Sequence, residues 1–258
     1  MIYMVCCVAV SPLRLEPNHK SEMVSQLLFG EAGELLEESK EFIKIRCLYD
    51  GYEGWCQRNQ LASGIGYQPE AAPSVLVGDW TDKVSINGVP AYVSMGTPII
   101  TPAHTDITIG PYRISYLTSS PYNAAAATPT PEAIMARAMR YLNTPYIWGG
   151  RSVFGIDCSG FVQMVFRFFN KPLPRDAWMQ AKQGESIGFF QEARCGDLAF
   201  FDDEEGMITH VGILLNDQEI IHASGKVRID KIDNAGIINM DTQQRTHKLR
   251  IIKRYFPF

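Results

Sequence analysis

The pattern of apolar and polar positions divides the chain into two differently built parts. Up to about residue 127, short apolar runs alternate with turn residues, which is typical of short strands joined by tight turns. Beyond that point a helical period comes first and strands follow. Helices followed by strands are the pattern of an α+β domain. We therefore predict small β-barrels followed by an α+β domain.

Residues 1–63 have the pattern of a small β-barrel, because several short strands fall within about 60 residues. The predicted strands are Val5–Val10, Glu34–Leu36, Phe42–Arg46 and Gly54–Cys56, with turns at 18–20, 29–31 and 49–51. Residues 64–127 are again β-like and rich in Thr, Pro and Gly, which predicts a second, more degenerate barrel. Its candidate strands are Ser74–Val77, Ala91–Ser94, Thr97–Thr101 and Tyr112–Leu117.

The third predicted domain covers residues 128–258 and follows the linker at Ala124–Ala127. Thr130 can cap a helix that has Pro131 in its first turn and runs to about Leu142. A second helix, ending near Phe169, has apolar residues at helical spacing and should bury one face. The strands predicted after it are Asp197–Phe201, Ile208–Leu215, Glu219–Ala223 and Lys248–Tyr255.

Composition and charge narrow the class of protein. The 46% apolar content is ordinary for a globular chain. With 24 basic and 28 acidic side chains the net charge is −4, which argues against nucleic acid as the main partner. No stretch approaches the ~20 apolar residues of a membrane span. The first ten residues have no basic leader, so a cytoplasmic location is expected, or a periplasmic or exported one if a leader was removed.

One of the six cysteines occupies a chemically distinctive place. The six are too sparse for a disulfide framework and have no CxxC spacing. Cys158 lies between Asp157 and Ser159, directly before the apolar helix. In the first turn of a helix, free N–H groups and the positive end of the dipole favour a thiolate. Cys158 is therefore a candidate nucleophile, while the other five are expected to be packing residues.

Two histidines lie on consecutive predicted strands. If residues 216–218 form a three-residue hairpin turn, Gly212 faces His222 and His210 becomes a diagonal neighbour of His222 on the same face. A two-residue turn would place the two histidines on opposite faces. The favoured geometry suits a Cys158 nucleophile, a His210 general base and a His222 that orients this base.

A zinc site built from the same three residues is the alternative. The twelve-residue separation of the two histidines and the cysteine at a helix start disfavour zinc. We therefore predict no metal and no other cofactor.

Several ordered motifs resemble the NlpC/P60 cysteine peptidases. They extend across residues 128–258: Tyr146-x-Trp-Gly-Gly, Gly155-x-Asp-Cys-Ser-Gly-Phe, Leu173-Pro-Arg-Asp, Gly196-Asp-Leu-x-Phe-Phe, Thr209-His-Val-Gly-Ile and His222-Ala. In the first 63 residues, Leu13–Pro17 and Asp50–Trp55 are similar to bacterial SH3 (SH3b) domains. With both sets of motifs, the whole chain resembles the γ-D-glutamyl-L-diamino acid endopeptidases that cleave murein peptides.

This resemblance implies a papain-like catalytic domain, preceded by two small SH3b-like barrels. It implies hydrolysis of the bond between γ-D-Glu and a diamino acid, in murein-derived peptides with a free N-terminal L-Ala, through a Cys158 thioester. Cys158, His210 and His222 would be the triad. Tyr146 would help the Cys158 N–H bind the oxyanion.

The resemblance also implies where the substrate binds. Asp157 and Ser159 would hold the free amine, with Asp176 as a further contact. Glu16 and Tyr52 of the first barrel would form a wall of the cleft, unless they are simply a solvated loop residue and a barrel-core residue. Ala177 stands where the family often has Ser, which leaves fine substrate preference open. The choice between diaminopimelate and lysine is open as well.

Two other functions use the same residues or domains. An acyltransferase or amidase on the same core would form the thioester but pass the acyl group to an acceptor other than water. A non-catalytic wall-binding protein would use the SH3b domains alone, and the intact Cys/His/His set argues against it.

Overall fold

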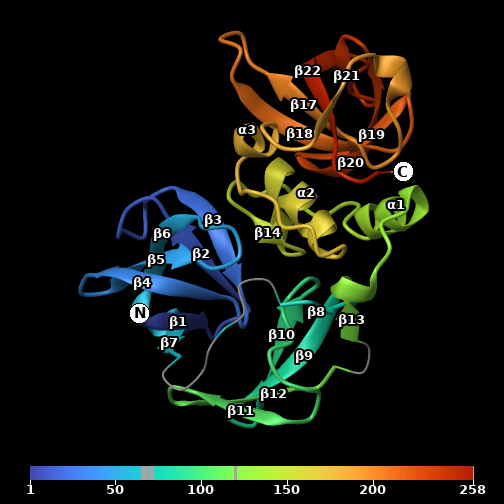
Figure 1. The fold of residues 1–258 in the computed structure, drawn as a ribbon. Coiled ribbons are helices and arrows are strands. Elements are labelled where there is room, and N and C mark those ends of the chain that lie inside the picture. The colour runs from blue at the N-terminus through green and yellow to red at the C-terminus, as the bar shows by residue number, and fades with distance from the viewer. Residues whose placement is uncertain (65–68, 70–72, 119–120, 258) are drawn as a thin grey trace. The chain divides into compact units, whose positions relative to one another are not determined.

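The computed structural model describes residues 1–64, 69, 73–118 and 121–257, which form two compact units (Figure 1). The first unit contains Met1–Ala127 together with Trp148–Phe154 and Asn170–Pro172. The second contains Thr128–Ile147, Gly155–Phe169 and Leu173–Phe258. The chain therefore crosses between the units several times, and two short segments from the region of the catalytic motifs belong to the first unit. Within the described residues, no helix is long and apolar enough to cross a bilayer.

Seven strands from residues 1–63 form one antiparallel sheet, in the order β3-β2-β6-β5-β4-β1-β7. They are β1 Tyr3–Cys6, β2 Val10–Arg14, β3 Met23–Leu28, β4 Ala32–Glu38, β5 Phe42–Cys47, β6 Glu53–Gln57 and β7 Leu61–Ser63, with a 3₁₀ turn η1 at Arg58–Gln60. The single strand predicted at Val5–Val10 is wrong, because the chain bends at residues 7–9 and continues as β2. The strand β3 was not predicted, since consecutive residues at its end are all buried and give no alternation.

Residues 73–127 add a four-stranded sheet, ordered β10-β9-β12-β11, and a separate pair β13-β8. The strands are β8 Val75–Val77, β9 Thr81–Ile86, β10 Val89–Ser94, β11 Asp106–Ile109, β12 Tyr112–Tyr116 and β13 Pro121–Asn123, followed by the 3₁₀ turn η2 Ala124–Ala126. The strand predicted at Thr97–Thr101 is wrong, since these residues form only an isolated bridge at Pro98. Asn87 and Gly88, both with positive φ, make the tight hairpin between β9 and β10.

A shared hydrophobic cluster joins these two parts of the first unit. Val5 and Phe29 from the first sheet pack in the same buried cluster as Val84, Val93 and Tyr116 from the second. The Phe29 and Tyr116 rings meet edge to face with centroids 6.0 Å apart. Residues 1–63 and 64–127 are thus parts of one compact unit, and their division into two SH3b-like domains stays a prediction.

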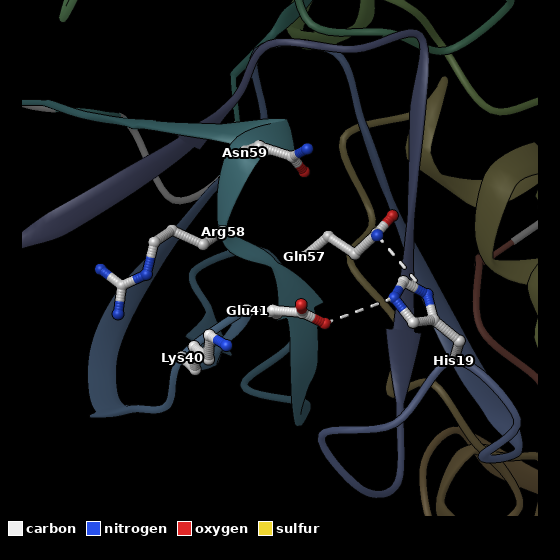
Figure 2. Close-up of a pocket in the computed structure, with 6 residues that line it drawn as sticks. All are labelled: His19, Lys40, Glu41, Gln57, Arg58 and Asn59. Atoms are coloured by element: carbon white, nitrogen blue, oxygen red, sulfur yellow. Dashed lines mark hydrogen bonds and ion pairs between the residues drawn. The ribbon is translucent and has the colours of Figure 1, made fainter.

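The surface of the first sheet has a hollow of about 530 Å³, lined by His19, Lys40, Glu41, Gln57, Arg58 and Asn59 (Figure 2). The His19 ring lies 3.8 Å from a Glu41 carboxylate oxygen and 3.5 Å from the Gln57 amide. It also meets the Phe42 ring edge to face at 5.0 Å. These contacts make His19 part of the surface network of the sheet.

The segment 148–154 is bound into the first unit through Arg151, in the short strand β14 Arg151–Ser152. The Arg151 guanidinium is fully buried and pairs with Glu31 at 3.0 Å. Its Nη1 also donates to the Gln26 carbonyl, and its backbone N–H donates to the Gln26 side chain. The exposed Trp148 indole donates to Glu22 at 2.6 Å. These contacts hold the segment against β3 and its neighbours.

Three helices belong to the second unit: α1 Pro131–Met139, α2 Cys158–Arg167 and α3 Ala177–Gln180. The Thr130 hydroxyl caps α1 by accepting from the Ala133 N–H, and Pro131 is the first helical residue, as predicted. The helix ends three residues before Leu142. The predicted apolar face of α2 is buried, and the rest of the helix is buried as well.

An antiparallel sheet follows, in the order β16-β22-β17-β18-β19-β20-β21, and an additional pairing of β21 with β22 closes β17 to β22 into a ring (Figure 1). The strands are β15 Gly155–Ile156 outside the sheet, then β16 Glu185–Ile187, β17 Leu198–Asp202, β18 Ile208–Leu214, β19 Glu219–Ser224, β20 Lys226–Asp233, β21 Gly236–Ile238 and β22 Arg245–Arg254, with a 3₁₀ turn η3 Phe190–Glu192. All four predicted strands are present. Helix α2 packs against β18 and β19.

Candidate active site

Cys158 is the first residue of α2, and Asp157 is the cap of this helix. The Asp157 carboxylate accepts a hydrogen bond from the Gly160 N–H at 2.7 Å, which fixes the start of the helix. The Cys158 sulfur lies 4.0 Å from the Thr209 carbonyl oxygen. Because Thr209 directly precedes His210 on β18, the thiol lies against the strand that carries the predicted base.

The electrostatic setting of Cys158 differs from the expectation. Burial, followed by the Asp157 charge, raises the pKa of the thiol to about 12. The Val211 backbone and the Arg175 guanidinium oppose this rise but are weaker. The helix start alone therefore does not give a thiolate, and the thiol needs a base to remove its proton.

The hairpin that joins β18 to β19 sets the positions of the two predicted histidines. Gly212 pairs with His222, and the Leu215 N–H donates to the Glu219 carbonyl, so the turn has the three residues that were expected. The His210 Nε2 and His222 Nδ1 atoms are 2.8 Å apart. A zinc ion does not fit this pair, because the two nitrogens face each other at hydrogen-bond distance.

A buried carboxylate continues the row of side chains. Asp230, on β20, lies 2.9 Å from the His222 Nε2 atom through its Oδ2 and is 1% exposed. Sequence reasoning missed Asp230. The pairing of β19 with β20 could have revealed it, because His222 lies opposite Arg228 and Asp230 is then the diagonal neighbour of His222. His210 is the corresponding diagonal neighbour on β18.

A third histidine, also missed, stacks on the predicted base. The His247 ring, on β22, lies nearly parallel to the His210 ring with centroids 4.1 Å apart. Burial, followed by His222, lowers the pKa of His247 to about 4. Burial, His222 and His247 likewise hold the pKa of His210 well below its usual value. His210 is therefore a neutral imidazole near pH 7, as a general base must be.

Tyr146 lies in the same electrostatic environment. Its backbone bridges to Ile156 and donates to the Gly225 carbonyl at 3.0 Å, and its side chain is half-buried. Burial and then the charges of Cys158 and Asp157 raise the pKa of Tyr146. The hydroxyl therefore stays protonated at neutral pH and can donate a hydrogen bond.

Asp157 and Ser159, predicted to bind an amine, already contact a buried cation. Arg175 Nη1 donates to Asp157 Oδ1 at 3.0 Å and to Ser159 Oγ at 2.9 Å, and its Nη2 donates to Asp157 Oδ2. This pair lies almost entirely out of water, at 2% and 8% side-chain exposure. The amine-binding role stays a prediction. It requires the Asp157 carboxylate to contact both the Arg175 guanidinium and the substrate ammonium.

The remaining predicted substrate contacts lie in different elements. Asp176 is the half-buried cap of α3, and its carbonyl accepts from Met179 and Gln180. Glu16 is exposed in the loop after β2, with its N–H donating to the Ser21 hydroxyl. Tyr52 is half-buried and packs against the core of the first sheet. The place of Glu16 and Tyr52 in a cleft wall stays a prediction.

Comparisons with known sequences match the segment that carries these residues. The pattern of the NlpC/P60 family matches residues 143–246, and the pattern of the bacterial dipeptidyl-peptidase Sh3 domain matches residues 13–61. The chain contains an NlpC/P60 domain behind a bacterial SH3 domain. The NlpC/P60 match includes Cys158, His210, His222, Asp230 and Tyr146.

Two relatives and one solved structure extend the likeness. A gamma-D-glutamyl-L-lysine dipeptidyl-peptidase of Bacillus cereus is 27% identical over 93% of this chain and 77% of its own length. A protein of the same name from Bacillus subtilis is 41% identical, but over only 36% of this chain and 32% of its own length. The crystal structure of an NlpC/P60 family protein from Bacillus cereus superposes over 99% of this chain and 100% of its own, with a TM-score of 0.83 and 21% identity. This structure supports the fold of the whole chain.

Proposed function

We propose that this protein is a cysteine peptidase that cleaves the γ-D-Glu–diamino acid bond of murein-derived peptides with a free N-terminal L-Ala. The observation that carries the proposal is the hydrogen bond between His210 on β18 and His222 on β19, together with the Cys158 thiol that lies against β18 next to His210. The names of the two Bacillus relatives support a γ-D-glutamyl substrate, with lysine as the diamino acid.

The first half of the reaction forms a thioester. Since His210 Nε2 is bonded to His222, Nδ1 is the nitrogen left to take the Cys158 proton. As the proton leaves, Sγ attacks the γ-carbonyl carbon of D-Glu. The oxyanion then collapses, the C–N bond breaks, and His210 returns the proton to the leaving amine of the diamino acid.

The second half consumes one water molecule. His210 Nδ1 takes a proton from water as the oxygen attacks the thioester carbon, and the C–S bond breaks. The proton then passes to the Cys158 sulfur, which restores the thiol. The raised pKa of Cys158 and the lowered pKa of His210 favour neutral partners in the resting enzyme, so proton transfer and attack occur together.

Two further roles belong to the proposal. The protonated Tyr146 hydroxyl and the N–H of Cys158 would donate to the developing oxyanion. Asp157, Ser159 and Asp176 would receive the substrate ammonium, and Glu16 and Tyr52 would limit the cleft to short peptides.

The experiment is to offer L-Ala-γ-D-Glu-L-Lys and its diaminopimelate counterpart, each with a free and with an acetylated amine, and to follow products by mass spectrometry. We expect release of the diamino acid from the free peptides. C158A should lose at least ~10³-fold in kcat. C195A is the matched control, because Cys195 is another free cysteine of the same unit, and it should keep full activity.

Three outcomes would contradict parts of the proposal. Full activity of C158A would refute the cysteine nucleophile. A mass that shows transfer to an added amine instead of water would indicate an acyltransferase. Equal cleavage of acetylated peptides would remove the amine-binding role of Asp157, Ser159 and Asp176.

A further inference from the structure

The carboxylate of Asp230 is held from three sides in the interior of the second unit. Its Oδ2 atom lies 2.9 Å from His222 Nε2. Its Oδ1 atom accepts from Arg228 Nη2 at 2.8 Å and from the Met240 N–H at 2.9 Å. Hydrogen bonds from His222, Arg228 and Met240 outweigh burial and lower the pKa of Asp230, so the carboxylate stays ionised.

An ionised carboxylate only accepts hydrogen bonds, and this fixes the protons on both rings. His222 must carry its proton on Nε2 to donate to Asp230. A neutral His222 then has a lone pair on Nδ1, which must accept from His210 Nε2. A neutral His210 with its proton on Nε2 has its lone pair on Nδ1. This is the nitrogen that the proposed reaction needs as a base.

We propose that Asp230 is a positioning residue of the active site, which sets the tautomers of His222 and His210 and stabilises the positive charge that His210 gains during catalysis. The inference rests on the proposed function and adds a fourth member to the Cys158, His210 and His222 set. Without the carboxylate, His222 can carry its proton on Nδ1. His210 Nε2 would then accept a hydrogen bond from His222 Nδ1–H. The proton of neutral His210 would lie on its own Nδ1, which would lose the lone pair that acts as the base.

The surroundings of Asp230 suit this role. Arg228 donates to both Asp230 and Asp241, which holds the carboxylate in one orientation. The groups that face His222 are the His210 ring, the His247 ring at 5.8 Å and the Asp230 carboxylate. Because His247 is neutral near pH 7, Asp230 supplies the negative charge next to the histidine pair.

The test compares D230N and D230A with the matched control D241N, which removes the exposed carboxylate on the other side of Arg228. In ¹⁵N-histidine NMR spectra, wild type and D241N should show His222 with Nε2 protonated and Nδ1 bare. D230N and D230A should show a mixed or reversed pattern. Their kcat should fall about 10²–10⁴-fold, with KM changed far less. The acidic limb of kcat/KM should move to lower pH, because the carboxylate no longer stabilises the imidazolium.

The outcomes separate this inference from the proposed function. Unchanged histidine signals and an unchanged acidic limb in D230N would overturn the role of Asp230, even if stability fell. Loss of activity that only follows the folded fraction would also overturn it. Activity that survives C158A would refute the peptidase mechanism, whereas the tautomer measurement needs no substrate and is read independently. If D230A does not fold, the nearly isosteric D230N decides the question.

Discussion

Three histidine rings meet at the centre of the site, and each is largely removed from water. His247 stacks on His210, and His210 is bonded to His222. Protonating a buried ring beside other rings is costly, which explains why the pKa of His210 and that of His247 both lie below the usual value. The active site is therefore sensitive to acid through its stability as well as through its chemistry.

The sign of this effect follows from the histidine pKa values. An unfolded histidine binds its proton near pH 6.5, while folded His247 binds it only near pH 4. As pH falls from 7 to 5 the unfolded state gains protons that the folded state does not, so stability falls. For His247 the loss in the free energy of unfolding is about 1–2 kcal/mol. Each kcal/mol corresponds to a fall of roughly 2–4 °C in Tm for a chain of this size.

Thermal unfolding at pH 7 and pH 5 checks this prediction. H247F keeps an aromatic ring on His210 but cannot titrate, so its Tm should fall less than that of wild type. H19Q removes an exposed histidine of the first unit and should behave as wild type does. Equal Tm losses in wild type and H247F would show that His247 does not carry the acid sensitivity.

The site residues that could be predicted from the sequence depend on local motifs and one hairpin. Those that could not be predicted depend on contacts between strands far apart in the chain. Cys158, His210 and His222 follow from local motifs and from one short hairpin, whose register depends only on the turn length. Asp230 needs a second hairpin register, and His247 needs the closure of β22 against β17 and β21. Arg175 belongs to the Leu173-Pro-Arg-Asp motif, yet its contact with Asp157 depends on how the segment before α3 folds back on α2.

At the scale of the elements, a glycine allows β18 and β19 to approach each other at the site. A Cβ atom on Gly212 would lie 2.8 Å from the His222 Cβ and 2.7 Å from an Ile220 methyl group. The His222 backbone cannot move aside without disturbing its bonds to His210 and Asp230. The register of this hairpin therefore requires a residue without a side chain at position 212.

We expect G212A to lower kcat by at least ~10-fold, because a shift of the order of 1 Å in a catalytic group has a large effect on rate. G188A is the matched control, since a Cβ there would meet no atom within 4 Å. Steady-state kinetics with circular dichroism would check both. Equal activity of the two variants would mean that β19 adjusts without moving His222.

Element prediction succeeded where the sequence carried a clear capping signal or apolar run, and it failed for several strands of the first unit. The Thr130 and Pro131 signal located the start of α1, and the strands around the two histidines were predicted nearly to their ends. In the first unit, β9 and β11 carry too few buried residues to give a clear alternation. Their place comes from pairing with β10 and β12, which no local pattern reveals.

On the scale of the whole molecule, the buried Arg151–Glu31 pair fixes residues 148–154 in the first unit. Removing one partner of a buried pair leaves an uncompensated charge, which typically costs 3–5 kcal/mol. We expect R151M to destabilise the protein by about this amount. R113M breaks an exposed pair with Asp106, where Arg113 is 73% exposed, and should cost at most ~1 kcal/mol.

Denaturant unfolding of both variants, with hydrogen exchange of the amides in residues 148–154, would measure the difference. Exchange in this segment should accelerate in R151M and stay unchanged in R113M. A double variant that replaces Arg151 with Met and Glu31 with Gln should recover part of the lost stability. If R151M and R113M cost the same, the pair does not anchor the segment.

The path of the chain between Ile147 and Gly155 limits how this protein can be rearranged in evolution. Residues 148–154 lie between Tyr146 and Cys158 in sequence, yet their partners Glu22, Gln26 and Glu31 come from the first sheet. A recombination that joined a different N-terminal region at residue 127 would keep every catalytic motif. It would leave the buried Arg151 guanidinium without the Glu31 carboxylate. We therefore expect a substitution at Glu22, Gln26 or Glu31 to be accompanied by a substitution within residues 148–154.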